Sequence, residues 1–243
     1  EAFTRPKMMR ALAKAGFDQS YTYFTWRTTK EELTEYFTEL CQGPSRDYLR
    51  PNLFANTPDI NPFHLQTGGR PAFMMRAALA ATLSSAYGIY SGFELCESAA
   101  LPGREEYLDS EKYEVKHRDW DAPGNIRAYI ASLNRIRREN PALHDFRNLR
   151  FYNAFDDQIL LYGKMTAGLD NVLLIAVNLD PHAVRGAAFE LPLWEFGLPD
   201  HEALQVEDLF TGAAWQWRGK IQHVVLDPGS NPAAIWRLSR PEA

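Results

Sequence analysis

The sequence of 243 residues is poor in several features, and each scarcity argues against a class of protein. The two cysteines, Cys41 and Cys96, lie far apart, so a disulfide framework is not indicated and a reducing cytoplasm is expected. No uninterrupted apolar run approaches the roughly 20 residues that cross a bilayer, so no membrane partner is expected. The formal net charge of -5 disfavours a surface for nucleic acid or anionic lipid.

The histidines offer no metal site. None of the six has a neighbour at the spacing that is typical of metal ligands. They are His64, His117, His144, His182, His201 and His223. Each is better interpreted as a lone core or surface histidine, so neither a metal nor another cofactor is expected. The sequence also shows no internal repeat and no low-complexity tract.

Aromatic residues, in contrast, are plentiful at 13%, and 45% of the residues are hydrophobic. The hydrophobic fraction is that of an ordinary globular protein with a sizeable core. Aromatic rings stack on the apolar faces of sugars, so the composition is compatible with a carbohydrate enzyme. On composition alone, an aromatic-rich core explains it better.

The first half of the chain alternates helical and strand patterns. Thr29 followed by Glu32 has the spacing of a capping box and predicts a helix start. Strands are expected at 21–26, 52–56 and 87–91, and helices at 5–16, from Thr29 to about 43, at 70–85 and at 124–139. Such alternation predicts parallel strands joined by crossover helices. The polar loop at 97–123 is longer than usual, and such loops are often functional.

The second half has a different pattern. Eight short strands separated by turn residues are expected, at 149–155, 158–164, 172–178, 186–191, 205–208, 214–217, 223–226 and 233–238. This spacing predicts an antiparallel β-sandwich. We therefore divide the chain into domains at 1–144 and 145–243. About four parallel strands leave open sheet edges, so a partner chain or further sequence should complete the first domain.

Three acids follow the predicted strands or precede a helix. They are Glu1, before the helix at 5–16, Asp59, after the strand at 52–56, and Glu94, after the strand at 87–91. In a (β/α)₈ barrel, the residues that follow successive strands share one pocket, and glycoside chemistry needs paired carboxyl groups there. Taken singly, Glu1 fits a helix-dipole partner, Asp59 an Asx-turn residue, and Glu94 a surface acid or an arginine partner.

The order and spacing of these segments resemble the α-amylase superfamily, and in more detail the alpha-1,4-glucan:maltose-1-phosphate maltosyltransferases of glycoside hydrolase family 13. The matching segments are Glu1-Ala2-Phe3-Thr4-Arg5-Pro6, Gln19-Ser20-Tyr21-Thr22-Tyr23-Phe24-Thr25-Trp26-Arg27, Asn56-Thr57-Pro58-Asp59-Ile60, Ser91-Gly92-Phe93-Glu94-Leu95-Cys96-Glu97 and Glu111-Lys112-Tyr113-Glu114. The resemblance implies an α/β plus all-β fold, namely the second half of a (β/α)₈ barrel (strands five to eight) followed by a β-sandwich domain.

The resemblance also implies residue roles. Glu1 matches the general acid/base, and Asp59 matches the acid that stabilises the transition state. Lys112 and Tyr113 fall on the loop that contacts the donor sugar, although a solvated lysine is an equally good interpretation of Lys112 from the residues alone. The nucleophilic aspartate of the family lies upstream of Glu1. The chain opens without methionine, so we expect missing upstream sequence and no activity from this chain alone.

The favoured function is retaining transfer of maltosyl units from α-maltose 1-phosphate to the non-reducing end of an α-1,4-glucan. The resemblance further implies a homodimer and requires the N-terminal half of the same enzyme as a partner. One alternative is an α-amylase-type hydrolase or glucanotransferase, which would use the same acids. Another is a non-catalytic carbohydrate-binding module.

The aromatic residues of the predicted sandwich are interpreted as core or inter-domain packing rather than as sugar platforms. They are Phe151, Tyr152, Trp194, Trp215, Trp217 and Trp236.

Overall fold

The computed structural model describes residues 4–110 and 115–241. Its helices are α1 (Pro6–Lys14), η1 (Tyr23–Trp26), α2 (Lys30–Gln42), η2 (Pro44–Asp47), α3 (Phe63–Leu83), η3 (Phe93–Leu95), α4 (Arg127–Glu139), η4 (Pro141–His144) and η5 (Leu193–Phe196). Its strands are β1 (Ser20–Tyr21), β2 (Pro51–Phe54), β3 (Ala86–Gly88), β4 (Leu149–Tyr152), β5 (Ile159–Met165), β6 (Val172–Asn178), β7 (Arg185–Glu190), β8 (Ala203–Asp208), β9 (Ala214–Arg218), β10 (Ile221–Leu226) and β11 (Ala233–Ser239). Among these described residues, no helix has both the length and the apolar character that a membrane span requires.

The start of α2 follows from its sequence. The Thr29 hydroxyl accepts the backbone N–H of Glu32 at 3.2 Å, and the Glu32 carboxylate accepts the backbone N–H of Thr29 at 3.2 Å. This reciprocal pair is the predicted capping box, and it satisfies two N–H groups that the first helical turn leaves unpaired. At the other end, the backbone of Gly43 leaves the helical conformation and α2 stops, as predicted.

The strand predicted at 21–26 is mostly wrong. Only Ser20–Tyr21 is extended, and Tyr23–Trp26 forms the 3₁₀ helix η1. The buried guanidinium of Arg76 on α3 explains the turn, because it donates to the Phe24 carbonyl at 2.5 Å and to the Arg27 carbonyl at 2.7 Å. Both carbonyls must turn towards one point, which an extended strand does not allow.

Helix α3 contains the helix predicted from residue 70, preceded by a further helical segment that was not predicted. It runs from Phe63 to Leu83 and is kinked at Gly69, whose backbone is non-helical with φ of 56°. Pro71 follows two residues later and lacks the N–H that a continuous helix would need there. The Gly-Gly pair and the proline therefore mark the start of the predicted helix, which follows the preceding helical segment at a kink.

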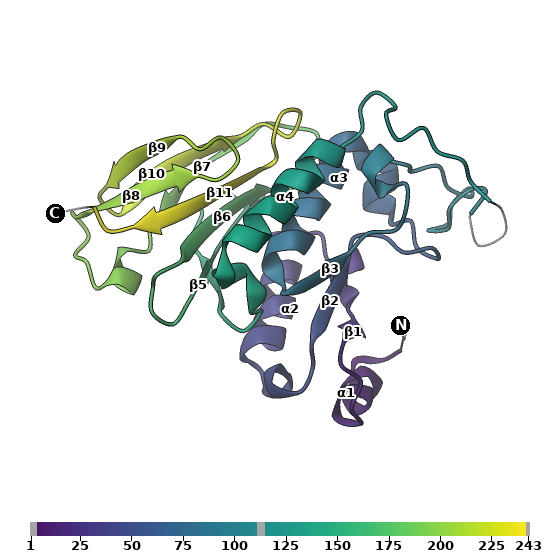
Figure 1. Cartoon of the computed structure of the whole chain (residues 1–243), viewed down its shortest axis with the longest axis horizontal. Helices are drawn as coiled ribbons and strands as arrows, with labels where there is room; N and C mark the ends of the chain where they lie inside the picture. The colour runs from purple at the N-terminus through teal and green to yellow at the C-terminus, as the bar shows by residue number, and fades with distance from the viewer. Residues whose placement is uncertain (1–3, 111–114, 242–243) are drawn as a thin grey trace.

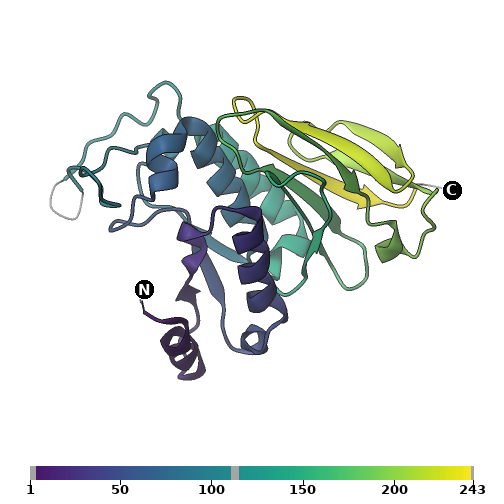
Figure 2. The same cartoon turned by 180° about the vertical axis from the view of Figure 1, so that it is seen from behind.

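The first half of the chain forms a small parallel sheet covered by helices. The strand order is β1-β2-β3, with both pairs parallel, as predicted for crossover connections. Figure 1 shows α3 and α4 between this sheet and the antiparallel strands of the second half. From α3, the residues from Ala72 to Leu83 are buried, because the helix meets protein on both sides (Figure 2).

The second half forms two packed antiparallel sheets, as predicted. One has the order β4-β5-β6-β11-β8-β9, and the other pairs β10 with β7. All eight predicted strands are present within a few residues of their expected bounds. Side chains of both sheets, from Leu161 on β5 to Phe189 on β7 and Val224 on β10, share one buried apolar cluster. The arrangement is a β-sandwich.

The aromatic residues of the sandwich behave largely as expected. Trp236 is buried, and Trp217 packs against it with ring centroids 4.9 Å apart. Phe151 packs against the core next to the helices, whereas Tyr152 and Trp215 pack against the core between the sheets. Trp194 is the exception, with 47% of its surface exposed.

A second buried cluster joins the two halves. It contains residues of α2, α3 and α4 together with Leu160, Tyr162 and Leu173 on the helix-facing side of the six-stranded sheet. Arg135 on α4 adds a hydrogen bond to the carbonyl of Leu209 in the second half at 3.0 Å. The apolar core therefore runs across residue 145, where the domain boundary stays a prediction.

Candidate active site

The three parallel strands deliver their following segments to one edge of the sheet. Tyr21 at the end of β1 lies opposite Asn52, and Phe54 at the end of β2 lies opposite Gly88 at the end of β3. The segments at 22–29, 55–62 and 89–126 therefore start side by side. In Figure 1 the long loop after β3 extends away from the sandwich beyond this edge. Polar residues on these three segments form the candidate site.

Asp59 sits on a tight turn of the segment after β2. The backbone groups of Thr57 and Ile60 exchange hydrogen bonds of 3.0 and 3.1 Å, and the Asp59 N–H donates to the Thr57 hydroxyl at 3.2 Å. The side chain of Thr57 is buried while Asp59 is exposed. Thr57 therefore supports the turn on its buried side, and the Asp59 carboxyl lies at the surface. This matches the prediction of an acid just past the end of a strand.

Asn56 fixes this segment to the segment after β3. Its side-chain N–H donates to the Tyr107 hydroxyl at 2.6 Å, and its side-chain oxygen accepts the backbone N–H of Tyr90 at 2.8 Å. Burial raises the pKa of Tyr107 to about 12, so its hydroxyl stays protonated at neutral pH. All of these groups are neutral, and the contact is a rigid support rather than a source of protons.

Further hydrogen bonds hold the long loop against the same segment. The Asn61 side chain donates to the Ser98 carbonyl at 3.0 Å, and the Gln66 side chain donates to the carbonyls of Asn61 and Arg104 at 2.7 and 2.9 Å. Ser110 adds a longer bond of 3.4 Å to the Pro58 carbonyl. The loop up to residue 110 is therefore built onto the turn that carries Asp59.

Glu94 and Glu97 have structural contacts in the described residues. The Glu94 carboxylate accepts the backbone N–H of Gly92 at 3.2 Å. Glu97 forms a two-bond ion pair with Arg118, at 2.9 and 3.3 Å, and the Arg118 side chain is only 5% exposed. Gly92 has φ of 95°, and a Cβ there would lie 2.3 Å from Glu97, so this position needs glycine. The ion pair anchors both ends of the loop.

Of the four residues predicted to act in the site, only Asp59 falls within the described part of the chain. Glu1, Lys112 and Tyr113 lie outside the described residues. The nearest described neighbour of Glu1 in sequence is Thr4, whose carbonyl accepts the Tyr23 hydroxyl of η1 at 2.8 Å. Thr4 is thus attached to the segment after β1.

Sequence reasoning missed the residues that support the site. Asn56 stood within a matching motif, but nothing in that motif indicated its contacts with Tyr90 and Tyr107. Asn61 and Gln66 carried no signal at all, because their partners are backbone carbonyls of a loop with no regular pattern. Only the fold shows which carbonyls lie within reach.

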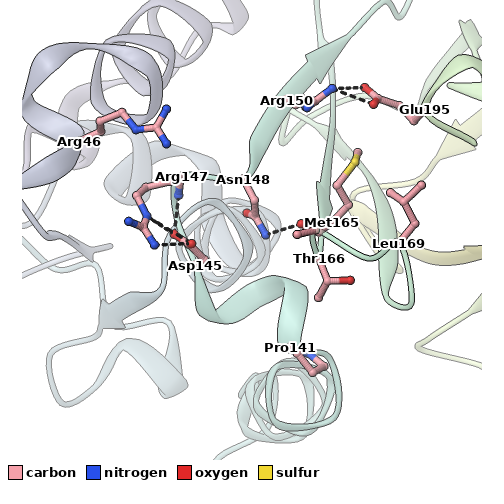
Figure 3. A pocket seen from close by; sticks show the side chains of 11 residues that line it. Arg46, Pro141, Asp145, Arg147, Asn148, Arg150, Met165, Thr166, Leu169 and Glu195 are labelled. Atoms are coloured by element: carbon pink, nitrogen blue, oxygen red, sulfur yellow. Dashed lines mark hydrogen bonds and ion pairs between the residues drawn. The ribbon is translucent and has the colours of Figure 1, made fainter.

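A separate pocket of about 750 Å³ lies where β4 and β5 meet η4 (Figure 3). Four of its charged groups are paired with one another, and Arg46 pairs with Asp47, outside the lining, at 3.9 Å. Arg147 binds Asp145 through two nitrogens at 3.0 and 2.9 Å, and Arg150 binds Glu195 at 2.7 Å. The hydrogen bond from Arg147 lowers the pKa of Asp145. None of its described lining residues comes from the segments after β1, β2 and β3, so the pocket is separate from the candidate site.

The described residues contain no cluster of three or more histidine, cysteine or acidic side chains that would suit a metal ion. His64 on α3 is largely buried, and burial lowers its pKa to about 4, so it is neutral at physiological pH. Cys41 and Cys96 are both free thiols. These observations add no metal-ligating or nucleophilic group to the candidate site.

Three kinds of comparison relate the chain to known proteins. A family model described as "GLGE, C-terminal" matches residues 151–238. The alpha-1,4-glucan:maltose-1-phosphate maltosyltransferase of Pseudomonas aeruginosa is 62% identical over 243 residues, which is all of this chain and 37% of that protein. The protein of the same name from Rhodospirillum rubrum is 62% identical over 98% of this chain and 35% of its own length. The chain thus spans about a third of the length of these curated relatives.

Solved structures show the fold relationship. The α-amylase of Geobacillus thermoleovorans superposes with a TM-score of 0.71 over 99% of this chain and 53% of its own, at 14% identity. An Anoxybacillus α-amylase superposes with a TM-score of 0.66 over all of this chain and 52% of its own, also at 14% identity. At this identity the likeness concerns the fold alone.

Proposed function

This chain belongs to the family of the alpha-1,4-glucan:maltose-1-phosphate maltosyltransferases, and we propose that it forms part of an enzyme that moves maltosyl units from α-maltose 1-phosphate to the non-reducing end of an α-1,4-glucan. The observation that carries the proposal is the 62% identity that extends over the whole chain. It covers the segments around the candidate site as well as the sandwich. Because the chain spans 37% of that relative, the activity is proposed for the longer protein.

The first domain, residues 1–144, is proposed to be the second half of a (β/α)₈ barrel, and residues 145–243 its C-terminal sandwich domain. The three parallel strands with helices on one side support this assignment. The superposition on about half of an α-amylase chain supports it as well. Barrel enzymes place their chemistry at the carboxyl ends of the strands, which is the edge where Asp59 lies.

Glu1 is proposed as the general acid/base and Asp59 as the acid that stabilises the transition state, with Lys112 and Tyr113 contacting the donor sugar. The nucleophilic aspartate would come from the rest of the longer protein. The exposed position of Asp59 on a turn held by Thr57 supports its role, since a carboxylate there can reach a bound sugar without moving the backbone.

The proposed reaction has two displacements. In the first, the nucleophilic carboxylate forms a bond to the anomeric carbon as the bond to the phosphate oxygen breaks, and Glu1 gives a proton to the departing phosphate. In the second, the acceptor hydroxyl attacks the same carbon, Glu1 takes the hydroxyl proton, and the enzyme ester breaks. Two inversions restore the α configuration. Asp59 stabilises the positive charge that develops on the sugar ring in both steps.

The remaining parts of the proposal concern assembly. The N-terminal part of the same protein is the partner that would complete the barrel, because the β1-β2-β3 sheet has two open edges in the described residues. A homodimer and a cytoplasmic location are proposed from the family membership. No metal or cofactor takes part in the proposed chemistry.

The experiment that tests the proposal uses the full-length enzyme with α-maltose 1-phosphate and a maltooligosaccharide acceptor. Phosphate release and acceptor growth in steps of two glucose units, both lost in Glu1→Gln, are the expected result. Cleavage of the oligosaccharide without phosphate release would replace transfer by α-amylase-type hydrolysis. If glucan binding survives Glu1→Gln and Asp59→Asn and the unmodified protein shows no turnover, the protein is a carbohydrate-binding module and not an enzyme.

A further inference from the structure

One carboxylate connects the segments that follow all three parallel strands. The indole N–H of Trp26, after β1, donates to one oxygen of Glu105 at 2.9 Å. The backbone N–H of Phe63, after β2, donates to the other oxygen at 3.1 Å. Glu105 itself belongs to the long loop after β3. Trp26 and Glu105 are 79 positions apart in sequence, so this side chain is a long-range tie.

The backbone around Glu105 is tied to the same place. Its carbonyl accepts the backbone N–H of Asn61 at 2.8 Å, and the preceding carbonyl, of Arg104, accepts the Gln66 side chain at 2.9 Å. Asn61 follows Asp59 by two residues. The loop therefore meets the segment that carries Asp59 through its main chain and meets η1 through the Glu105 side chain.

Arg76 fixes the η1 side of this contact. It is fully buried and holds the carbonyls of Phe24 and Arg27, which flank Trp26 in sequence. Because Arg76 anchors the carbonyls on both sides of Trp26, the backbone that carries the indole is a fixed point. The Glu105 carboxylate then sets where the loop stands relative to that point.

From this geometry we infer that Glu105 is a positioning residue of the proposed active site, which holds the loop at 97–110 in register with Trp26 and with the turn of Asp59. This inference rests on the proposed function. Glu105 acts through the loop and is not assigned a contact with the substrate. The loop continues into Lys112 and Tyr113, the residues proposed to contact the donor sugar, so its placement should govern donor binding.

The two contacts of Glu105 require a carboxylate, so the inference can be tested with a side chain of the same size. Two N–H donors converge on Glu105, and a carboxylate offers an acceptor oxygen to each. A glutamine has one acceptor oxygen and one NH₂ group, so it would lose one of the two bonds and bring two donors together. Glutamine keeps the size of the side chain, which limits the effect on packing.

The neighbouring residue supplies a matched control. Glu106 is exposed, and its side chain forms a surface ion pair with Arg104 at 3.5 Å, with side chains 55% and 64% exposed. Such pairs contribute little to stability. Glu106→Gln makes the same chemical change one position away without touching Trp26 or Phe63.

The test measures kcat and KM of the full-length enzyme for α-maltose 1-phosphate. Glu105→Gln should raise KM about tenfold with kcat changed by less than about threefold, because the loop is displaced while the reacting groups remain. Glu106→Gln should change neither value. A fall in kcat at unchanged KM would indicate less folded enzyme or a lost transition-state contact, and it would overturn the inference, as would identical kinetics for the two variants.

A second variant tests the partner. Trp26→Phe removes the donor and leaves the carboxylate, so combining it with Glu105→Gln should raise KM no further than the more damaging single change. Additive effects would overturn the inference. If the unmodified enzyme cleaves oligosaccharide and releases no phosphate, the proposed function fails. In that case, the KM values of Glu105→Gln and Glu106→Gln for the oligosaccharide decide whether Glu105 positions the loop.

Discussion

The hydroxyl groups of Tyr162 on β5 and Thr82 on α3 lie 2.5 Å apart, both fully buried, where the sandwich meets the helices. Thr82 also lies 2.6 Å from the Ala78 carbonyl and must donate its one hydrogen there. Tyr162 is therefore the donor in the bond between the two side chains. Burial raises the pKa of Tyr162, which keeps this donor protonated.

Tyr162→Phe should lower the free energy of unfolding by about 1 kcal/mol, because a buried hydrogen bond is lost while the ring is kept. Denaturant unfolding monitored by circular dichroism measures the change. Tyr48→Phe is the control, since Tyr48 is partly exposed and its ring lies under Lys14. Equal stability of the two variants would mean that the Tyr162–Thr82 bond contributes nothing across the junction.

The sequence predicted the elements on either side of this junction better than the junction itself. Hydrophobic alternation and turn residues located all eight sandwich strands. The division at residue 145 was drawn from the change in pattern, yet Tyr162 and Leu173 of the sandwich lie in the same buried cluster as α3 and α4. Periodicity reports which face of an element is apolar, but it does not say which other element covers that face.

Lys164, two residues along β5, points to the same junction without a hydrogen-bond partner for its amino group among the described residues. Burial lowers its pKa to about 7, against the ordinary value of 10.5, and Arg137 lowers it further, while Cys41 and Asp145 raise it. The unfolded chain therefore binds more protons than the folded one between about pH 7 and pH 10.5, so stability should rise with pH over that range.

Lys164→Met should therefore raise the melting temperature at pH 6 and lose most of this advantage at pH 10. The methionine removes a buried charge that is costly at low pH, and it packs as the neutral amine does at high pH. Thermal unfolding across this pH range measures the difference. Lys7→Met, at an exposed position, is the control and should give no trend with pH. A gain that is constant from pH 6 to pH 10 would argue that packing, and not charge, is responsible.

The candidate site was less accessible to sequence reasoning than the fold. Asp59 could be found because an acid shortly after a strand has a positional meaning in parallel sheets and because its motif resembles that of a known family. Glu105 could not be distinguished from Glu106, since both stand in a polar loop and only the folded chain brings Trp26 and Phe63 to one of them. The strand predicted through Trp26 failed for a similar reason, because the buried Arg76 that bends it is 49 residues from Arg27.

The capping box of α2 makes a local prediction. Thr29→Ala should lower the free energy of unfolding by about 1 kcal/mol, because the Glu32 N–H loses its acceptor at the helix start. Thr34→Ala, within the same helix, should be neutral or slightly stabilising, since alanine has the higher helix propensity. Denaturant midpoints of the two variants compare the positions directly. A loss of stability in both would point to packing of α2 and not to its cap.

The capping box also predicts that the stability of the protein depends on pH. The backbone N–H groups of Thr28 and Thr29 lower the pKa of Glu32, with Thr28 the larger cause. A carboxyl with a lowered pKa in the folded state stabilises that state above its unfolded pKa and loses this contribution as pH falls. Glu32→Gln should therefore destabilise the protein at pH 7, and the difference from the unmodified protein should shrink towards pH 3. A difference that stays constant over this range would contradict the charge-dependent part of the cap.

Asp59 gives the sharpest prediction for catalysis. If its carboxylate stabilises charge in the transition state, Asp59→Asn should lower kcat of the full-length enzyme by about a hundredfold or more and change KM far less. The fold should survive, because the turn is held by the backbone groups of Thr57 and Ile60 and by the Thr57 hydroxyl. Asp109→Asn is the matched control, since Asp109 is exposed with φ of 52°, a conformation that asparagine tolerates. An Asp59→Asn enzyme with normal kcat and a raised KM would make Asp59 a binding residue only, and the transition-state role would have to pass to another acid.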